Sequence, residues 1–218
     1  MAILHYQPPM DPYISIVYQD DAFVILNKPS ELLTVPGKPS DHKDCLETRV
    51  QTVFPTATIV HRLDMATSGL LIMALTKAAH REISRQFQQR ETQKRYIARV
   101  FGHIKDDEGS IELPLICDWP NRPKQIVDIE NGKAALTHYQ VLNRDDNQSR
   151  VLLKPVTGRS HQLRVHMLSL GHPILGDRLY AHTEALAMAD RLQLHAQWIA
   201  FKHPDNGKKV QFNVDCPF

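Results

Sequence analysis

The sequence predicts a mixed α/β (α+β) protein built on a mostly antiparallel sheet with hairpin connections. Three observations lead to this fold class. Apolar runs of strand length recur along the whole chain, and turn-forming residues separate them. Only two segments show the spacing of a helix that packs on a core. With 42% hydrophobic and 23% charged residues, the composition is that of a globular chain that buries a core.

The chain opens with an arm, and strands follow. Residues 1–15 contain three prolines and are predicted to form an extended N-terminal arm, with the first strand starting near Ile16. Residues 30–45 are rich in Pro, Ser, Lys and Asp, which is typical of a loop. The further strands are predicted at residues 23–26, 58–64, 70–75, 96–101, 137–142, 151–156, 194–201 and 209–214.

Two helices are expected. Thr76 is a suitable N-cap for the first, whose apolar residues recur at i, i+4 and i+8. These residues are Ala79, Ile83 and Phe87. The second helix is predicted at residues 159–170, with Thr157 as a possible cap and Gly171 as its stop.

The bulk composition limits the classes of function. A net charge of +2 does not by itself indicate a nucleic-acid binder. The three cysteines are odd in number and form no C-x-x-C motif, so neither a disulfide framework nor a cysteine zinc site is predicted. Such thiols fit a reducing cytoplasm. The N-terminus has no apolar signal core, and the longest apolar run, residues 70–75, is far too short for a membrane span. We therefore expect a cytoplasmic protein.

Basic residues gather in one stretch of the nearly neutral chain. Seven Lys or Arg and two Glu lie between residues 77 and 99. The basic residues are Lys77, Arg81, Arg85, Arg90, Lys94, Arg95 and Arg99. Such a basic stripe can track a phosphate backbone, and the plain alternative is a solvated helix face.

The most informative segment is His61–Gly69, with the sequence H-R-L-D-M-A-T-S-G between two strand-like runs. Loops held by rigid elements on both sides often carry chemistry. Arg62 and Asp64 are two positions apart, so an extended segment would direct both side chains to one face. A carboxylate would then lie beside a cation that can grip a phosphate or a base.

This segment resembles the signature of the RluA family of RNA pseudouridine synthases. Three further blocks resemble the family in the same order: residues 156–166, residues 171–177 and residues 194–196. Lys94-Arg95-Tyr96 places a tyrosine where the family expects one before a strand. Residues 116–125 resemble most closely the bacterial members that act on two RNAs. The resemblance covers roughly residues 16 to 214 and implies the pseudouridine synthase fold, whose long central sheet carries a catalytic cleft.

The resemblance also implies a domain organisation. At 218 residues the chain fits one ordinary domain, and we expect a single catalytic domain over residues 1–218. Longer family members begin with a small S4-like RNA-binding domain. The early first strand leaves no room for that domain here, so RNA affinity is expected to come from the catalytic domain of a monomer.

The resemblance assigns three catalytic residues. Asp64 is the catalytic carboxylate, which either attacks the anomeric carbon or abstracts a sugar proton, and the sequence leaves both open. Arg164 is expected to pair with that carboxylate and keep it ionised. Tyr96 is expected to stack on the flipped uracil, with its hydroxyl near C5. Each has an ordinary alternative, namely a turn Asp, a surface helix Arg and a half-buried strand Tyr.

Five residues are predicted to bind RNA or substrate. Arg62 is expected to fill the gap left by the flipped uridine, or else to contact a phosphate. The other four are His61, Thr67, Arg159 and His161. The family implies two partners, a 23S ribosomal RNA stem-loop and the anticodon stem-loop of certain tRNAs. A small protein could recognise both by a shared folded shape.

No cofactor and no metal are expected. The isomerisation involves no redox change, and the chain has neither a Gly-rich phosphate loop nor a dinucleotide fingerprint. Several histidines surround the motifs, but His161 and His166 are five apart, which does not place both on one helix face. They are expected to bond to backbone groups or RNA.

Two other functions compete with the synthase. The first is a hydrolase of glycosidic or phosphodiester bonds that uses Asp64 with a second acid such as Asp177. The second is a non-catalytic RNA-binding module that uses the basic stripe and Tyr96. Only the two enzymes depend on Asp64, and only the hydrolase needs water in the site and releases the base.

Overall fold

A computed structural model describes residues 6–218, which fold into two compact units. Among these residues, the first unit comprises residues 6–94 together with residues 196–217, and the second comprises residues 95–195 with Phe218. The prediction that they form one catalytic domain stays a prediction. The described part of the N-terminal arm, residues 6–15, contains no helix or strand, as expected, and residues 1–5 lie outside the described residues.

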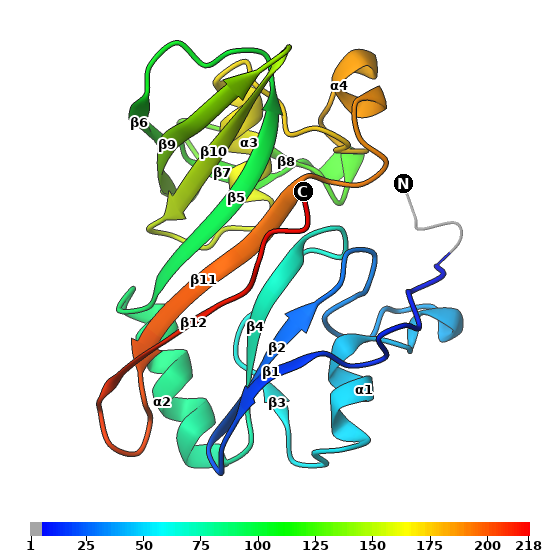
Figure 1. The fold of residues 1–218 in the computed structure, drawn as a ribbon, viewed down its shortest axis with the longest axis vertical. Helices are drawn as coiled ribbons and strands as arrows, with labels where there is room; N and C mark the ends of the chain where they lie inside the picture. Colours follow the sequence, from blue (N-terminus) through cyan, green and yellow to red (C-terminus); the bar gives the residue numbers. More distant parts are fainter. Residues whose placement is uncertain (1–5) are drawn as a thin grey trace. The chain divides into compact units, whose positions relative to one another are not determined.

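The first unit is a sheet with one main helix. Its strands are β1 (Ile16–Gln19), β2 (Phe23–Lys28), β3 (Thr58–Ile59), β4 (Ser68–Ala74), β11 (Leu194–Lys202) and β12 (Lys209–Asn213). The order is β1-β2-β4-β11, with β3 on β4 and β12 on β11. Its helices are η1 (Ser40–His42), α1 (Leu46–Gln51) and α2 (Lys77–Gln88). Figure 1 shows β1, β2 and β4 side by side. β4 is buried along its whole length, which explains its continuous apolar run.

The core of this unit confirms the helical spacing. The Thr76 side chain accepts a hydrogen bond from the Ala79 N–H, so Thr76 caps α2 as predicted. Ala79 and Ile83 are fully buried against Phe23 and Ile72 of the sheet, and Phe87 packs at their edge. Apolar residues three to four positions apart therefore form the face that joins α2 to the strands.

Gly69 ends the signature because of a close backbone approach. Its φ is +111°, and a Cβ added there would lie 2.3 Å from the Ala196 carbonyl oxygen on β11. That neighbour is backbone and cannot rotate away. Only glycine combines such a φ with this contact.

Gly69→Ala is expected to lower the free energy of unfolding by about 3 kcal/mol, because backbone strain and overpacking add. Gly207→Ala is the matched control, since Gly207 has φ +69° but an added Cβ there would meet no atom within 4 Å. It should cost about 1 kcal/mol, the strain alone. Urea unfolding of both variants checks this, and equal losses would contradict the argument.

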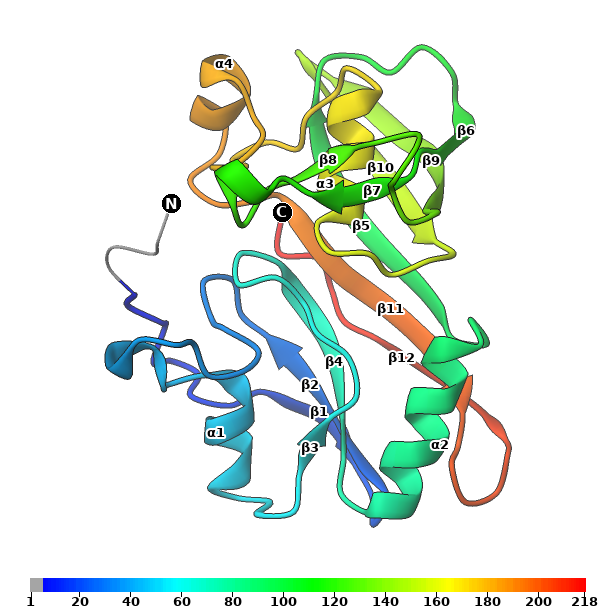
Figure 2. The ribbon, with the colours of Figure 1, turned by 180° about the vertical axis from the view of Figure 1, so that it is seen from behind.

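The second unit contains four strands and a smaller hairpin. The strands have the order β5 (Gln93–Phe101), β10 (Gln148–Pro155), β9 (Leu136–Asp145) and β6 (Glu108–Glu112). The hairpin pairs β7 (Leu115–Cys117) with β8 (Gln125–Val127) around η2 (Trp119–Asn121). Two helices complete the unit, α3 (Gln162–Ser169) and α4 (Thr183–Ala187). Figure 2 shows α3 with β7 and β8 on one face of these strands.

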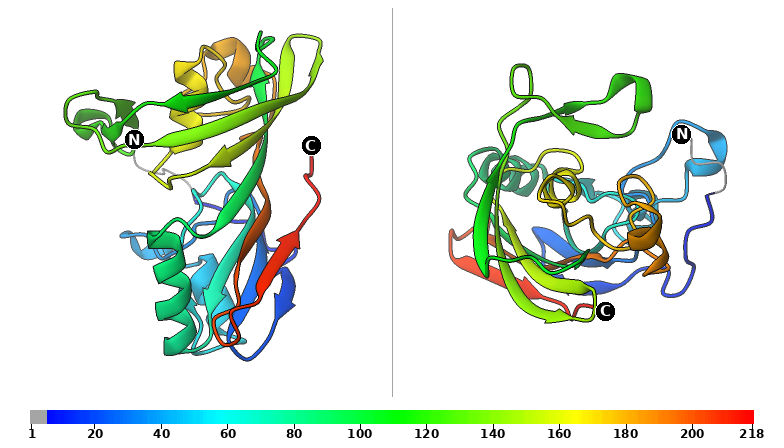
Figure 3. Two further views of the ribbon diagram at one scale, coloured as in Figure 1. Left: turned by 90° about the vertical axis from the view of Figure 1, so that its left-hand side faces the viewer. Right: turned by 90° about the horizontal axis from the view of Figure 1, so that it is seen from above.

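Residues 115–133 project from the second unit as an arm, here called the 115–133 arm. Figure 3 shows this segment standing away from β9 and β10. Backbone bonds in both directions between Leu115 and Lys133 join the two ends of the arm. The strand pairings within each unit, and in the hairpin, are antiparallel wherever their register is given, in line with the predicted fold class.

Two sequence-based expectations were wrong in detail. The strand predicted at residues 58–64 stops at Ile59, and the chain then runs as a loop to Thr67. Arg62 and Asp64 therefore do not share a face through strand alternation. Thr157 does not cap α3, because its hydroxyl accepts the Leu136 N–H and donates to the Gln162 side chain. The N-cap position is His161, in the left-handed region with φ 54°.

Candidate functional site

The predicted site residues fall in both units. His61, Arg62, Asp64 and Thr67 lie in the loop of the first unit between β3 and β4. Tyr96, Arg159, His161 and Arg164 lie in the second unit, on β5 and around the start of α3. In the second unit, His161 and Arg164 lie near the same tyrosine, Tyr180, whereas Tyr96 pairs with Leu153 of β10.

Side chains of residues 28–34 hold the loop that carries Asp64. The Thr34 hydroxyl donates to the Leu63 carbonyl at 2.7 Å, and the Ser30 hydroxyl donates to the Ala66 carbonyl at 2.7 Å. The Asp64 carbonyl accepts the Thr67 N–H at 3.1 Å. These bonds replace the ladder that a strand would have offered, which is why the predicted strand ends early. The loop is fixed on both sides of the Asp64 carboxylate.

Lys28 is the central part of this support. Its side chain is fully buried, and its ammonium donates to the carbonyl oxygens of Pro29, Leu32 and Met65 at 2.8, 2.7 and 2.9 Å. Met65 directly follows Asp64. A buried charge is tolerated only when it is well bonded, so the ammonium strongly restrains these carbonyls. Sequence reasoning missed Lys28, because a Lys before Pro at the end of a strand looks like a turn residue.

His61 is partly buried and packs against the core of the first unit. Its ring stacks on Phe87 at 4.5 Å between centroids, and its Nε2 accepts the Ile72 N–H at 3.1 Å. Because Nε2 accepts, the ring hydrogen lies on Nδ1. Burial, with a smaller effect of the Lys94 charge, lowers the pKa of His61 to about 3. The ring therefore anchors the loop to β4 and α2, and the expected contact of His61 with RNA stays a prediction.

This buried imidazole should make the protein sensitive to acid. The pKa of His61 is lower in the folded than in the unfolded state, so its contribution is complete above about pH 6.5 and falls as the pH drops towards 3. The slope is about 1.4 kcal/mol per pH unit in that window. Urea unfolding between pH 7 and pH 4.5 should show a steeper loss in the wild type than in His61→Phe. Equal slopes of unfolding free energy against pH in the two proteins would contradict the role of His61 in this acid sensitivity.

Arg62 and Thr67 lie at opposite extremes of exposure. Arg62 is exposed in the middle of the loop, as a residue that inserts into RNA requires. Thr67 is 3% exposed and leads into β4, and its N–H closes the turn around Asp64. The arrangement thus presents one cation to solvent and uses Thr67 to shape the turn.

The second cluster centres on Arg164 in α3. Its Nε and Nη2 donate to the two carboxylate oxygens of Asp177 at 2.8 and 2.6 Å, and both side chains are at most 5% exposed. Asp177 also accepts the backbone N–H groups of Leu179 and Tyr180. This two-pronged pair fixes the plane of the guanidinium. Arg164 is therefore a buried, oriented cation rather than a surface helix Arg.

The surrounding residues support the start of α3. The His161 Nδ1 lies 2.7 Å from the Tyr180 hydroxyl, and the Arg159 Nε donates to the Ala134 carbonyl at 3.1 Å. Arg159 remains exposed, so its other donors face solvent-accessible space. Tyr96 is half-buried on β5, where it pairs with Leu153 of β10.

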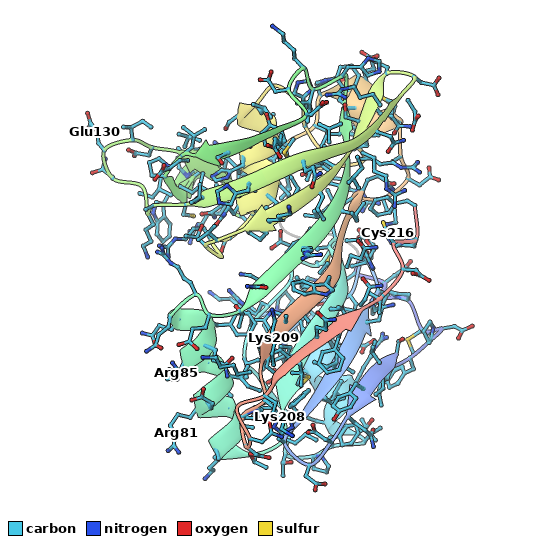
Figure 4. The ribbon with its side chains drawn as sticks, turned by 60° about the vertical axis from the view of Figure 1, so that its left-hand side comes forward. Arg81, Arg85, Glu130, Lys208, Lys209 and Cys216 are labelled. Atoms are coloured by element: carbon cyan, nitrogen blue, oxygen red, sulfur yellow. The ribbon has the colours of Figure 1, made fainter. Side chains whose placement is uncertain are left out.

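The basic stripe is smaller than its composition indicated. Arg85 forms ion pairs with Glu82 and Glu91, each at 2.7 Å, and its charge is largely balanced. Lys94 is partly buried, with its ammonium 5.8 Å above the Phe87 ring. Figure 4 shows Arg81 and Arg85 projecting from α2. The exposed cations left on this stretch of the first unit include Lys77, Arg81 and Arg90.

Within residues 6–218, no group of three or more His, Cys, Asp or Glu side chains is placed to hold a metal ion. In the same residues no helix is long and apolar enough to cross a membrane. His166 is instead buried between the Thr137 hydroxyl and the Leu113 carbonyl.

Comparison with known proteins shows the family of this chain. Residues 22–169 match the family model described as RNA pseudouridylate synthase. The chain is 57% identical over 219 residues to the dual-specificity RNA pseudouridine synthase RluA of Salmonella typhimurium, with all of both chains covered. It is 62% identical over 204 residues to the protein of that name from Yersinia pestis, covering 93% of this chain and 99% of the relative.

A solved structure shares the fold. Human RNA Pseudouridylate Synthase Domain Containing 1 matches with a TM-score of 0.81 and 33% sequence identity, covering 97% of this chain and 87% of the human chain. The likeness thus extends over both units.

Proposed function

Because the chain belongs to the RNA pseudouridylate synthase family and is an isomerase of that class, we propose that it modifies specific uridines in two kinds of RNA. These are a stem-loop of 23S ribosomal RNA and the anticodon stem-loop of certain tRNAs. The support is the name dual-specificity RNA pseudouridine synthase carried by relatives that align over the full chain. The reaction breaks the N-glycosidic bond of uridine, turns the base, and rejoins it through C5.

The observation that carries the proposed mechanism is the fixed loop around Asp64. Bonds to the carbonyls of Leu63, Asp64, Met65 and Ala66 hold the backbone on both sides of the carboxylate. A reacting group is most effective when its position is set before the substrate arrives. In the proposed mechanism, Asp64 acts at the sugar of the flipped uridine, either as nucleophile or as base.

Arg164, Tyr96 and Arg62 have supporting roles in this mechanism. We assign to Arg164 the pairing with Asp64, since Asp177 already orients the guanidinium through Nε and Nη2. Tyr96 stacks on the uracil, with its hydroxyl near C5. Arg62, exposed on the loop, fills the space that the uridine leaves in the RNA. The exposed Arg159 contacts RNA phosphate.

The position of Asp177 argues against the hydrolase alternative, which would use it as a second acid. Asp177 is 1% exposed, and its two oxygens accept bonds from Arg164 and from the backbone of Leu179 and Tyr180. A general acid must reach the leaving group of its substrate, and a buried carboxylate whose two oxygens are already bonded within the protein is not placed to do so. The synthase, which needs one carboxylate only, fits the geometry better.

We place the enzyme in the cytoplasm as a monomer. In the described residues no disulfide joins Cys45, Cys117 and Cys216, which suits a reducing compartment. Size-exclusion chromatography with light scattering reports the oligomeric state directly.

Tritium release tests the proposed function. RNA transcripts of the tRNA anticodon stem-loop and of the 23S stem-loop, each labelled with tritium at uridine C5, are incubated with the protein. Pseudouridine formation must expel that hydrogen, whereas hydrolysis or simple binding does not require it. Release from both RNAs is expected. Release from one would narrow the specificity, and release from neither would contradict the proposal.

A further inference from the structure

Tyr180 contacts Arg164, its partner Asp177 and the helix cap His161. Its hydroxyl accepts the Gln125 N–H at 2.8 Å and lies 2.7 Å from His161 Nδ1. Its ring lies under the Arg164 guanidinium, 5.1 Å from centroid to carbon. Its own N–H donates to Asp177, the carboxylate that holds Arg164. One side chain therefore touches both the cation and the helix that carries it.

The same residue anchors the 115–133 arm. Gln125 begins β8, so its bond to the Tyr180 hydroxyl ties the arm to the body of the unit. The Tyr180 ring also packs on an apolar cluster that joins the arm to α3. That cluster consists of Leu115, Ala135 and Val165, with Val127 at its edge. The arm thus rests on α3 through Tyr180.

The arm presents a surface that suits an unpaired base. Trp119 is 64% exposed, and the Arg122 guanidinium lies 4.5 Å over its ring. Exposed aromatic rings with a stacked cation are typical platforms for single-stranded nucleic acid. The η2 turn is held by backbone bonds between Asp118 and Lys124 and between Asn121 and Asp118, so the platform is rigid within itself. Its orientation then depends on the Tyr180 anchor.

We propose that Tyr180 is a positioning residue that keeps the 115–133 arm and the Arg164 guanidinium in one fixed arrangement. Through it, RNA held on the arm is aligned with the cation used in the chemistry. The hydroxyl holds the arm through its bond to Gln125, and the ring contacts the Arg164 guanidinium. The proposal rests on the proposed function. The two roles can be separated by mutation, because one variant removes only the hydroxyl and another also removes the ring.

Two variants test the division. Tyr180→Phe keeps the ring and removes the hydroxyl, so KM for the labelled stem-loop should rise about fivefold while kcat changes less than about twofold, as expected for one lost hydrogen bond. Tyr180→Leu also removes the ring under Arg164, and kcat should then fall about tenfold or more. Tyr18→Phe is the matched control, because it removes a hydroxyl bonded to Asp20 in the first unit.

Amide hydrogen exchange gives a readout that needs no activity. In Tyr180→Phe the Gln125 N–H loses its acceptor and should exchange about tenfold faster, while β10 amides keep their rates. Unchanged exchange at Gln125, or kinetic constants of Tyr180→Phe equal to those of Tyr18→Phe, would overturn the proposal. Thermal unfolding shows whether each variant is folded. If Tyr180→Leu is not folded, the kinetic constants and exchange rates of Tyr180→Phe alone test the proposal. Failure of the wild type to release tritium would refute the proposed function. The exchange rates would still test whether the Tyr180 hydroxyl holds the arm through Gln125.

Discussion

Replacing Asp64 with asparagine or alanine is expected to lower the rate of tritium release at least about a thousandfold, because the isomerisation needs the carboxylate at the sugar. RNA affinity should change less than about threefold, since one carboxylate contributes little to binding an anion. Asn keeps the shape of the side chain and removes only the charge. Single-turnover kinetics separate the chemical step from binding.

Asp107→Asn is the matched control for this loss. Asp107 pairs with Arg144 on the surface of the second unit and is 84% exposed, so its charge is solvated and plays no part in the proposed chemistry. That variant should retain wild-type kinetics. Turnover by Asp64→Asn near the wild-type rate would refute the mechanism, and loss of RNA binding together with turnover would favour the non-catalytic RNA-binding module.

Removing the carboxylate of Asp177 should have the largest effect on stability. Asp177→Ala leaves the Arg164 guanidinium buried without its two-pronged partner, and breaking such a pair costs about 3–5 kcal/mol. It also deprives the Leu179 and Tyr180 N–H groups of their acceptor. Asp177→Asn keeps one oxygen for these donors and should cost about half as much. Denaturant unfolding measures both losses.

The exposed ion pair between Asp107 and Arg144 is the control for this prediction as well. Asp107→Ala removes a partner of similar geometry, 2.7 Å from Arg144, but in water. It should cost less than about 1 kcal/mol. If Asp177→Ala were no more destabilising than Asp107→Ala, the Arg164 pair would not hold the second unit together. Activity of Asp177→Asn near the wild-type level would in addition exclude Asp177 as the second acid of a hydrolase.

The helices and strands that were predicted correctly are those whose pattern of apolar residues coincides with the side chains buried in the structure. α2 was found from its cap and its apolar spacing, and β4 from a run that is buried on both sides. The elements that were missed include α1, the hairpin of β7 and β8, and α4. Each is short and has few buried residues, so the periodicity over such a length is too weak to distinguish it from a loop.

For the candidate site, the sequence identified residues but not how exposed they are. Asp64, Arg62, Tyr96 and Arg164 were proposed from ordered motifs in the sequence, and the structure puts Arg62 on a loop surface and Arg164 in a buried ion pair. The His61 motif gave no sign that its ring stacks on Phe87 and accepts the Ile72 N–H. Exposure depends on which distant residues, such as Phe87, pack against a side chain, and a motif carries no information on that.

The sequence by itself determined the family, the fold class, the main strands and the carboxylate on which the chemistry is proposed to depend. Those features follow from residue types and spacing along the chain. Only the tertiary structure revealed that Lys28 fixes the Asp64 loop, that Asp177 orients Arg164, and that Tyr180 joins the 115–133 arm to that pair. The physical reason is that buried polar groups must find partners, and those partners lie 13 to 55 residues apart in the chain.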